Sequence, residues 1–196
     1  YVPVSKIAQT ATVVVDGASS QWHTMTDFVN YGKAHPGELR VGIATFGGVG
    51  HLDLVELMET TGAQFTFVPL AGAGESVPAV LGGHIEATTT SASSVHGQVE
   101  AGTIRVLGVP ADKHAALFPD VPTFKEQGFN ITRSEYHVVV APKGTPDAVV
   151  QTLQNALQKV TSDPAFTKFA NDNGITPDYK NAADTKAQLT TDQATL

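Results

Sequence analysis

Short runs of β-branched and apolar residues alternate along this chain with segments of helical periodicity. Strand character occurs over 12–15, 39–44, 64–68, 84–88, 104–109 and 136–141. Helices are predicted over 26–34, 50–61, 75–81, 95–101, 145–160 and a shorter stretch that ends at Gly174. Trp22, the single tryptophan, precedes the first helix and is expected to pack on its apolar face. The alternation is typical of βαβ units and predicts an α/β fold with a largely parallel sheet.

These elements predict two lobes of unequal completeness. Residues 16–134 contain four or five strands with interleaved helices, enough for one complete α/β lobe. The flanks, 1–15 and 135–196, hold only one or two strands. Their longest helix nevertheless carries an apolar stripe formed by Val149, Val150, Leu153, Leu157 and Val160. Because such a stripe needs a sheet to cover, we expect an incomplete second lobe. Upstream residues or another chain would complete it, and the latter would mean self-association through this lobe.

A glycine-rich segment joins a predicted strand to the helix that follows it. It contains Thr45, Gly47, Gly48 and Gly50 and ends at His51. Glycines bring free backbone N–H groups close to a ligand, and the positive end of the helix dipole favours an anion. A plain turn that needs positive φ is the alternative. His51 either contacts the ligand or only caps and packs its helix.

Two further strand ends carry candidate binding groups. Gly72, Ala73 and Gly74 follow one strand, and Thr90 and Ser91 lie in a turn rich in hydroxyl groups after the next. Ligands of open α/β sheets sit beyond the carboxyl ends of the strands, so the three segments are expected to converge. Helix capping is the alternative role for the hydroxyls.

Several other classes of function are excluded or weak. The net charge is −7 and no cluster of Lys or Arg occurs, which argues against a nucleic-acid partner. No phosphate-binding loop, GxSxG, HExxH or cysteine is present, so we predict no cofactor, no metal and no catalytic residue. His84 and Glu86, on one predicted strand face, are a weak metal candidate. A small α/β enzyme or sensor domain with His51 as general base is the alternative function.

No segment approaches the roughly 18 apolar residues of a membrane-spanning helix. The chain begins at Tyr1, and nothing like a signal peptide follows. We therefore expect a processed product or a fragment, whose localisation targeting signals do not reveal.

Seven segments, in order, resemble the substrate-binding proteins of tripartite tricarboxylate transporters, the Bug family. They are YGKAHPGEL at 31–39, the glycine loop ending in His51-Leu52, VPLAGAG at 68–74, LGGHIE at 81–86, AGTIRVL at 101–107, PDVPT at 119–123 and APKGTP at 141–146. Together they extend over nearly the whole chain.

The resemblance implies a periplasmic protein of the Venus-flytrap kind, similar to type II periplasmic binding proteins. Its two lobes would close on a small carboxylate or dicarboxylate, which is then delivered to membrane permease subunits. It also implies a further N-terminal segment, in agreement with an incomplete lobe, and that segment would supply half of the site. Phe46 stands where the family commonly has small residues or serine, so it is expected to narrow the pocket or add an apolar wall. Thr90 stands where some members have an acid, which argues against an amino-acid ligand.

Overall fold

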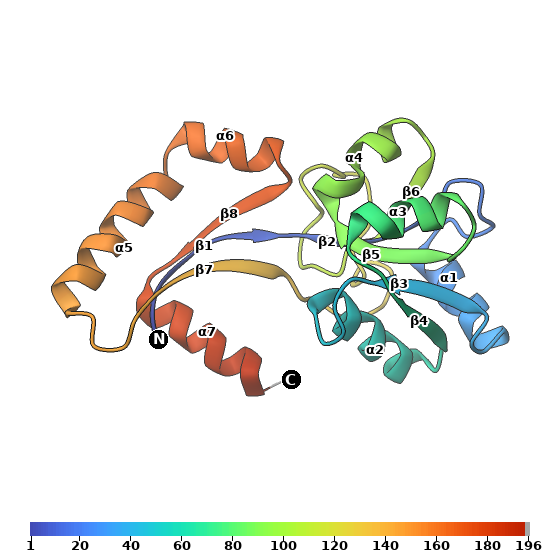
Figure 1. Ribbon diagram of the computed structural model, residues 1–196, viewed down its shortest axis with the longest axis horizontal. Coiled ribbons are helices and arrows are strands. Elements are labelled where there is room, and N and C mark those ends of the chain that lie inside the picture. Colours follow the sequence, from blue (N-terminus) through green and yellow to red (C-terminus); the bar gives the residue numbers. More distant parts are fainter. Residues whose placement is uncertain (195–196) are drawn as a thin grey trace. The chain divides into compact units, whose positions relative to one another are not determined.

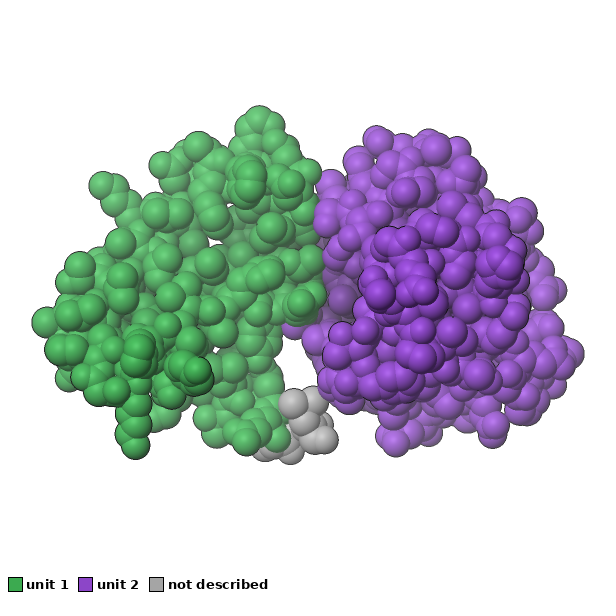
Figure 2. Space-filling model, viewed as in Figure 1, with its two compact units in different colours: residues 1–10, 135–196 green, residues 11–134 purple. Residues whose placement is uncertain are grey.

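The computed structural model describes residues 1–194, which form two compact units (Figures 1 and 2). Unit 1 contains residues 1–10 and the chain from Glu135 onwards, and unit 2 contains Ala11–Ser134. The chain enters unit 2 earlier than the predicted boundary at residue 16, because the strand that begins at Thr12 pairs within the sheet of unit 2.

Unit 2 is built on a five-stranded sheet of order β4-β3-β5-β2-β6. Its strands are β2 (Thr12–Gly17), β3 (Leu39–Ile43), β4 (Phe65–Pro69), β5 (Ala87–Ser91) and β6 (Ile104–Gly108). Its helices are α1 (Met25–Ala34), α2 (Val49–Thr61), α3 (Ala73–Leu81) and α4 (Ala92–Glu100). β3 is parallel to both neighbours, whereas β2 runs antiparallel to β5 and β6. The α/β prediction is confirmed, with one antiparallel strand inside the sheet.

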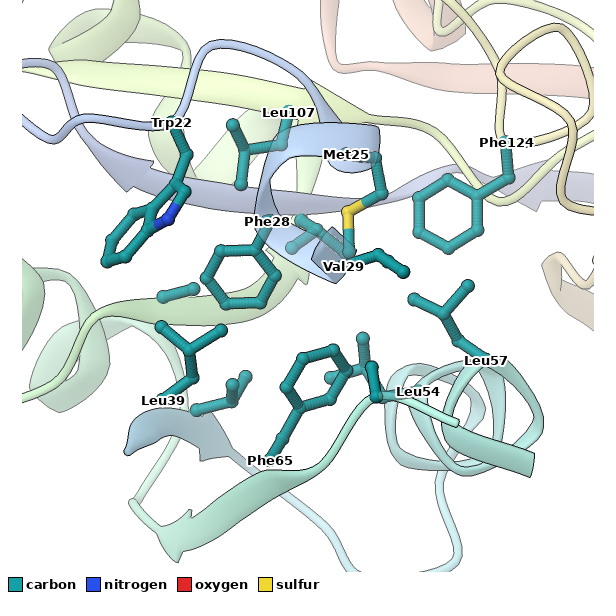
Figure 3. Packing of buried hydrophobic residues seen from close by; sticks show 14 of the residues in the cluster. Trp22, Met25, Phe28, Val29, Leu39, Leu54, Leu57, Phe65, Leu107 and Phe124 are labelled. Atoms are coloured by element: carbon teal, nitrogen blue, oxygen red, sulfur yellow. The ribbon is translucent and has the colours of Figure 1, made fainter. Parts of the chain in front are cut away.

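Helices cover both faces of this sheet. On one face α1 and α2 bury Met25, Phe28, Leu54 and Leu57, which belong to one cluster with Phe65 and Phe124 (Figure 3). On the other face α3 and α4 bury a second cluster, formed by Val77, Val80, Ala92 and Val95 against Val13 and Val15. Each fully buried Leu, Val or Phe stabilises the fold by about 1.5–3 kcal/mol. These two clusters therefore hold the sheet edge that carries the candidate site.

Trp22 packs as predicted on the first helix of this unit. Its ring lies edge-on to Phe28 and to Tyr31, with centroid distances of 5.3 and 5.2 Å. The threonine that caps this helix, Thr24, accepts a hydrogen bond from the backbone N–H of Asp27 at 3.0 Å, and the Asp27 carboxylate accepts from the Thr24 N–H at 3.0 Å. The reciprocal pair satisfies orphan donors of the first turn and explains why the helix begins here.

The buried face of α2 is centred on Leu54 and Leu57. The spacing of Leu52, Val55 and Met58 predicts a helix here, but of these three only Met58 packs on the core cluster, and Asp53 is buried with the two leucines. The segment carries apolar residues at both sets of positions, so periodicity alone cannot choose between the faces. An acidic residue is tolerated in the core because Arg133 pairs with it.

Two local predictions in unit 2 are wrong. The predicted strand over 84–88 begins only at Ala87, so His84 and Glu86 precede it and do not share a strand face. Glu86 instead accepts a hydrogen bond from Arg40 Nη2 at 2.6 Å. Within residues 1–194 no three His, Cys, Asp or Glu side chains are grouped to hold a metal ion. The sequence also suggests a short helix near Phe124, but residues 124–128 form a series of turns.

Unit 1 has a three-stranded antiparallel sheet of order β7-β1-β8. Its elements are β1 (Val2–Thr10), β7 (Glu135–Ala141), α5 (Asp147–Thr161), α6 (Pro164–Asp172), β8 (Ile175–Lys180) and α7 (Ala182–Ala194). Successive side chains of a strand point to opposite faces, so the burial of Val4, Ser5 and Lys6 in β1 shows that both faces are covered. α5 covers Val4 through Val150, and α7 accepts the Lys6 N–H on Thr185 Oγ1 at 2.8 Å.

The apolar stripe of α5 is only partly buried. Val150 packs in the core of unit 1 with Leu157 beside it. Val149, Leu153 and Val160 remain 46%, 40% and 48% exposed. The described chain therefore leaves these three residues uncovered, which agrees with the expectation that the second lobe is incomplete. No helix among residues 1–194 has both the length and the apolar character needed to cross a membrane.

Candidate functional site

Three strand ends meet at one edge of the sheet of unit 2. β3 is hydrogen-bonded in parallel to β4 on one side and to β5 on the other, so their carboxyl ends lie at the same edge. Ile43 is opposite Pro69, and the N–H of Leu70 donates to the Ile43 carbonyl at 3.1 Å. The predicted convergence of the three segments is confirmed in geometry.

The first loop, residues 44–48, is shaped by its glycines. Gly47 has a φ of +79°, which favours glycine, and Gly48 is the N-cap of α2. The N–H of Gly48 donates to the Thr45 carbonyl at 3.0 Å, and the N–H of Gly47 donates to Nδ1 of His51 at 3.1 Å. These two N–H groups therefore serve the loop itself, as the plain-turn alternative requires.

Backbone N–H groups without a hydrogen-bond acceptor in the described chain, here called the open donors, follow this loop in the first turn of α2. Among residues 1–194 no acceptor is bonded to the N–H groups of Val49, Gly50 and His51. The first N–H groups of a helix have no partner within it and carry the positive end of its dipole. A carboxylate at this turn would supply the missing acceptors.

Gly50 is required there for packing. A Cβ at this position would lie 2.5 Å from Oγ1 and 2.7 Å from Cβ of Thr89. The first turn of α2 thus lies directly against β5, at a distance that only glycine allows. This contact brings Thr89 of β5 next to the first turn of α2.

The second loop, residues 70–72, differs in its electrostatics. Gly72, with a φ of +77°, is the N-cap of α3, and the N–H groups of Ala73 and Gly74 have no bonded acceptor among residues 1–194. The carboxylate of Glu75, however, accepts a hydrogen bond from the Ala71 N–H at 2.6 Å. An acid in the first turn already offsets the helix dipole, so a second anion is less favoured here than at α2.

The hydroxyl-rich segment is not a turn at the predicted positions. Thr90 and Ser91 are the last residues of β5, and α4 begins immediately after them. Ser91 Oγ lies 2.7 Å from Ser94 Oγ and caps no backbone N–H. Opposite Ser91 lies Thr12, a residue that the sequence did not single out. Its buried hydroxyl has no partner among the described residues, and no motif marks it.

A buried ion pair supports α2 from within unit 2. Arg133 Nη1 lies 3.3 Å from Asp53 Oδ1, and Arg133 Nη2 lies 2.5 Å from Glu56 Oε2. Asp53 is 1% exposed, and its burial raises the pKa of the carboxyl to about 7 although Arg133 opposes the rise. The sequence does not reveal this cluster, because nothing in the spacing of residues so far apart indicates that they meet.

The ring of His51 is oriented for donation and not for proton abstraction. Because Nδ1 accepts the Gly47 N–H, the proton of the neutral ring is on Nε2. A general base needs a free acceptor nitrogen. His51 therefore offers an N–H donor, which argues against the enzyme alternative.

Unit 1 contains a cavity of about 490 Å³. Its lining is made of carboxamide side chains, Tyr179 and two alanines, and includes no charged group. Nothing there compensates a charged solute, so the open donors of α2 remain the candidate site.

The fold is that of the solute-binding proteins. A TctC solute-binding protein from Polaromonas, solved with no ligand, has a TM-score of 0.82 and 28% identity over 98% of this chain and 66% of its own. An R. palustris protein solved with adipate has a TM-score of 0.87 and 25% identity over 98% of this chain and 65% of its own. The predicted type of fold is confirmed.

The chain belongs to the tripartite tricarboxylate transporter family of receptors. The model of this family, described as "Tripartite tricarboxylate transporter family receptor", matches residues 1–195. A relative from Cupriavidus necator, the UPF0065 protein in the gbd 5' region, is 35% identical over 165 residues. That match covers 84% of this chain and 50% of the relative, so the chain spans about half the length of that protein. Membership confirms the predicted family and, with it, the prediction of a receptor and not an enzyme.

Proposed function

We propose that this chain is the part of a solute receptor that captures a small carboxylate at the first turn of α2. The open N–H groups of Val49, Gly50 and His51, at the point where three strand ends converge, are the observation that supports it. The solved relative with adipate is consistent with a carboxylate guest. The Nε2–H of His51 and the side chain of Thr45 are proposed as further donors.

The other predicted residues receive distinct roles in this proposal. Gly47 and Gly48 shape the first loop, while Gly72, Ala73 and Gly74 form a wall of the site. Thr90 and Ser91 supply hydroxyl groups at the end of β5. The carboxylate is assigned to α2 and not to α3 because Glu75 already occupies the first turn of α3.

The magnitudes indicate how much this half-site can do alone. Three charge-assisted hydrogen bonds contribute roughly 1.5–3 kcal/mol each. Association costs at least about 4 kcal/mol in lost freedom, whereas micromolar affinity requires about 8 kcal/mol net. The gross gain of three bonds does not reach the sum of these terms, so we propose that the rest of the whole protein contributes further contacts.

The remaining proposals follow the family. We propose that the whole protein acts in the periplasm and delivers its solute to membrane subunits of a tripartite transporter. We also propose that the exposed stripe of α5 is covered by further polypeptide of unit 1 or, in the isolated chain, by a second copy.

Titration calorimetry of the full protein against a panel of mono-, di- and tricarboxylates tests the capture proposal. The same compounds as amides or methyl esters, which lack the charge, are the control. Saturable binding of at least one acid, with none of its ester, is expected. Heat from no acid, or equal binding of the esters, would contradict carboxylate capture.

A further inference from the structure

An exposed aromatic side chain lies at the first loop. Phe46 is 56% exposed, although large apolar side chains of unit 2 are otherwise mostly buried. Its ring lies edge-on to His51, with a centroid distance of 4.9 Å, and to Phe67 at 6.5 Å. His51 lies edge-on to Phe67 in turn, at 4.8 Å. We call these three rings the aromatic ledge.

The ledge has a fixed base and an open end. Phe67 belongs to β4 and packs against the hydrophobic core of unit 2. His51 is held by the hydrogen bond from the Gly47 N–H to its Nδ1. Phe46 packs on the rings of His51 and Phe67, and more than half of its side chain is exposed. The ledge is therefore a preformed apolar surface.

The ledge and the open donors belong to the same turn of the chain. His51 supplies one of the three open N–H groups and also the central ring of the ledge. Phe46 and the first open donor, Val49, are separated only by Gly47 and Gly48. A molecule whose carboxylate meets these donors therefore presents its neighbouring atoms to an aromatic surface.

We infer that the solute carries an apolar body, either an aryl ring or a methylene chain, directly next to its carboxylate. This inference rests on the proposed function and specifies the substrate class of the same site. A polyhydroxylated acid would place hydroxyl groups against the rings of Phe46 and Phe67, which carry no hydrogen-bonding group, and this is costly. An aryl or alkyl body would instead cover Phe46. One aromatic contact of this kind corresponds to about three- to tenfold in affinity.

Hexanoate and gluconate provide a matched test, because both are six-carbon monocarboxylates. The carbons that carry only hydrogen in hexanoate each carry a hydroxyl group in gluconate. Phenylacetate supplies the aryl body. Titration calorimetry compares the three acids on the full protein, on Phe46→Ala and on the control Leu81→Ala. Leu81 is 49% exposed at the other end of α3, away from the loop ends.

The wild type is expected to bind hexanoate or phenylacetate at least tenfold more tightly than gluconate. Phe46→Ala should reduce this preference by three- to tenfold and change gluconate affinity less than twofold, whereas Leu81→Ala should keep the wild-type preference. The better of the two apolar acids then identifies an aryl or an alkyl body.

Other results would overturn the inference. An equal loss for all three acids in Phe46→Ala would make Phe46 a support of the loop. Gluconate bound as tightly as hexanoate by the wild type would refute the ledge while carboxylate capture stood. Binding of none of the three acids, nor of any other acid in the wider panel, would remove the inference together with the proposed function.

Discussion

Replacement of Gly50 by alanine tests the contact that positions the open donors. The added Cβ would meet Thr89 Oγ1 at 2.5 Å and Thr89 Cβ at 2.7 Å, so the first turn of α2 must move away from β5. Overpacking of this kind costs about 1–3 kcal/mol. Alanine also has a higher helix propensity than glycine, which returns about 0.5–1 kcal/mol.

Gly74→Ala is a matched control. Gly74 is the second residue of α3, as Gly50 is of α2, and a Cβ there has no heavy atom within 4 Å. The propensity gain applies to both variants and cancels in their comparison. The difference in unfolding free energy between them should therefore equal the packing term, about 1–3 kcal/mol.

Urea denaturation of the two variants measures this difference, and calorimetry measures the affinity for the best carboxylate. Gly50→Ala should be the less stable variant and should bind roughly tenfold more weakly, because the displaced turn misaligns three charge-assisted hydrogen bonds. Adding Thr89→Ala to Gly50→Ala should recover part of the stability, since it removes Oγ1 but not Cβ. Equal stability of Gly50→Ala and Gly74→Ala would refute the close packing of α2 on β5.

Four further variants, at three positions, probe other parts of the molecule. His51→Gln places an N–H donor near the position of Nε2, whereas His51→Asn keeps an acceptor near Nδ1 for the Gly47 N–H. Calorimetry should show weaker binding and near-normal stability for His51→Asn, and near-normal binding with lower stability for His51→Gln. Equal affinity and equal stability of the two variants would contradict this division of roles between the ring nitrogens. Burial raises the pKa of Asp53 to about 7, so its contribution to stability is full below about pH 4 and is lost as pH rises through 7. Between pH 5 and 8 the unfolding free energy of the wild type, measured by urea denaturation, should fall by about 2–3 kcal/mol relative to that of Asp53→Asn. Asp16 titrates in both proteins, so its contribution cancels in this difference. The same pH dependence of stability in both proteins would refute the raised pKa of Asp53. Leu153→Lys on the exposed face of α5 should lower the mass of any self-associated species in light scattering by at least half at equal concentration, and an unchanged mass would exclude this face as the contact.

The sequence predicts the elements of unit 2 well and those of unit 1 poorly. β3, α2 and β4 begin and end within one or two residues of the predicted positions, because strand and helix periods alternate there with glycine between them. β1, β8 and α7 were not predicted. β1 and β8 lie at opposite ends of the sequence, and β8 reads as a polar segment interrupted by Pro177. Long-range pairing of such segments leaves no local signal.

The location of the candidate site could be predicted from the sequence, but the groups that are free to bind a ligand could not. Glycine positions and the parallel order of the strands suffice to predict where the three loops meet. They do not reveal which N–H groups stay open, because this depends on side chains that fold back onto the loops. His51 takes the Gly47 N–H and Glu75 takes the Ala71 N–H. The buried pairing of Asp53 with Arg133 depends in the same way on contacts between segments far apart in the chain.

Deletion of one open donor tests the central claim most directly. Val49 is the first residue of α2, where proline is well tolerated, and Gly48 before it has φ −73° and ψ 166°, a conformation that suits a residue preceding proline. Val49→Pro therefore removes a single N–H and leaves the helix intact, while Val49→Ala alters the side chain and keeps the N–H. Calorimetry should show carboxylate affinity reduced by about 10-fold or more in Val49→Pro and nearly unchanged in Val49→Ala, with similar thermal stability. Wild-type affinity in Val49→Pro would contradict the claim that the first turn of α2 holds the carboxylate.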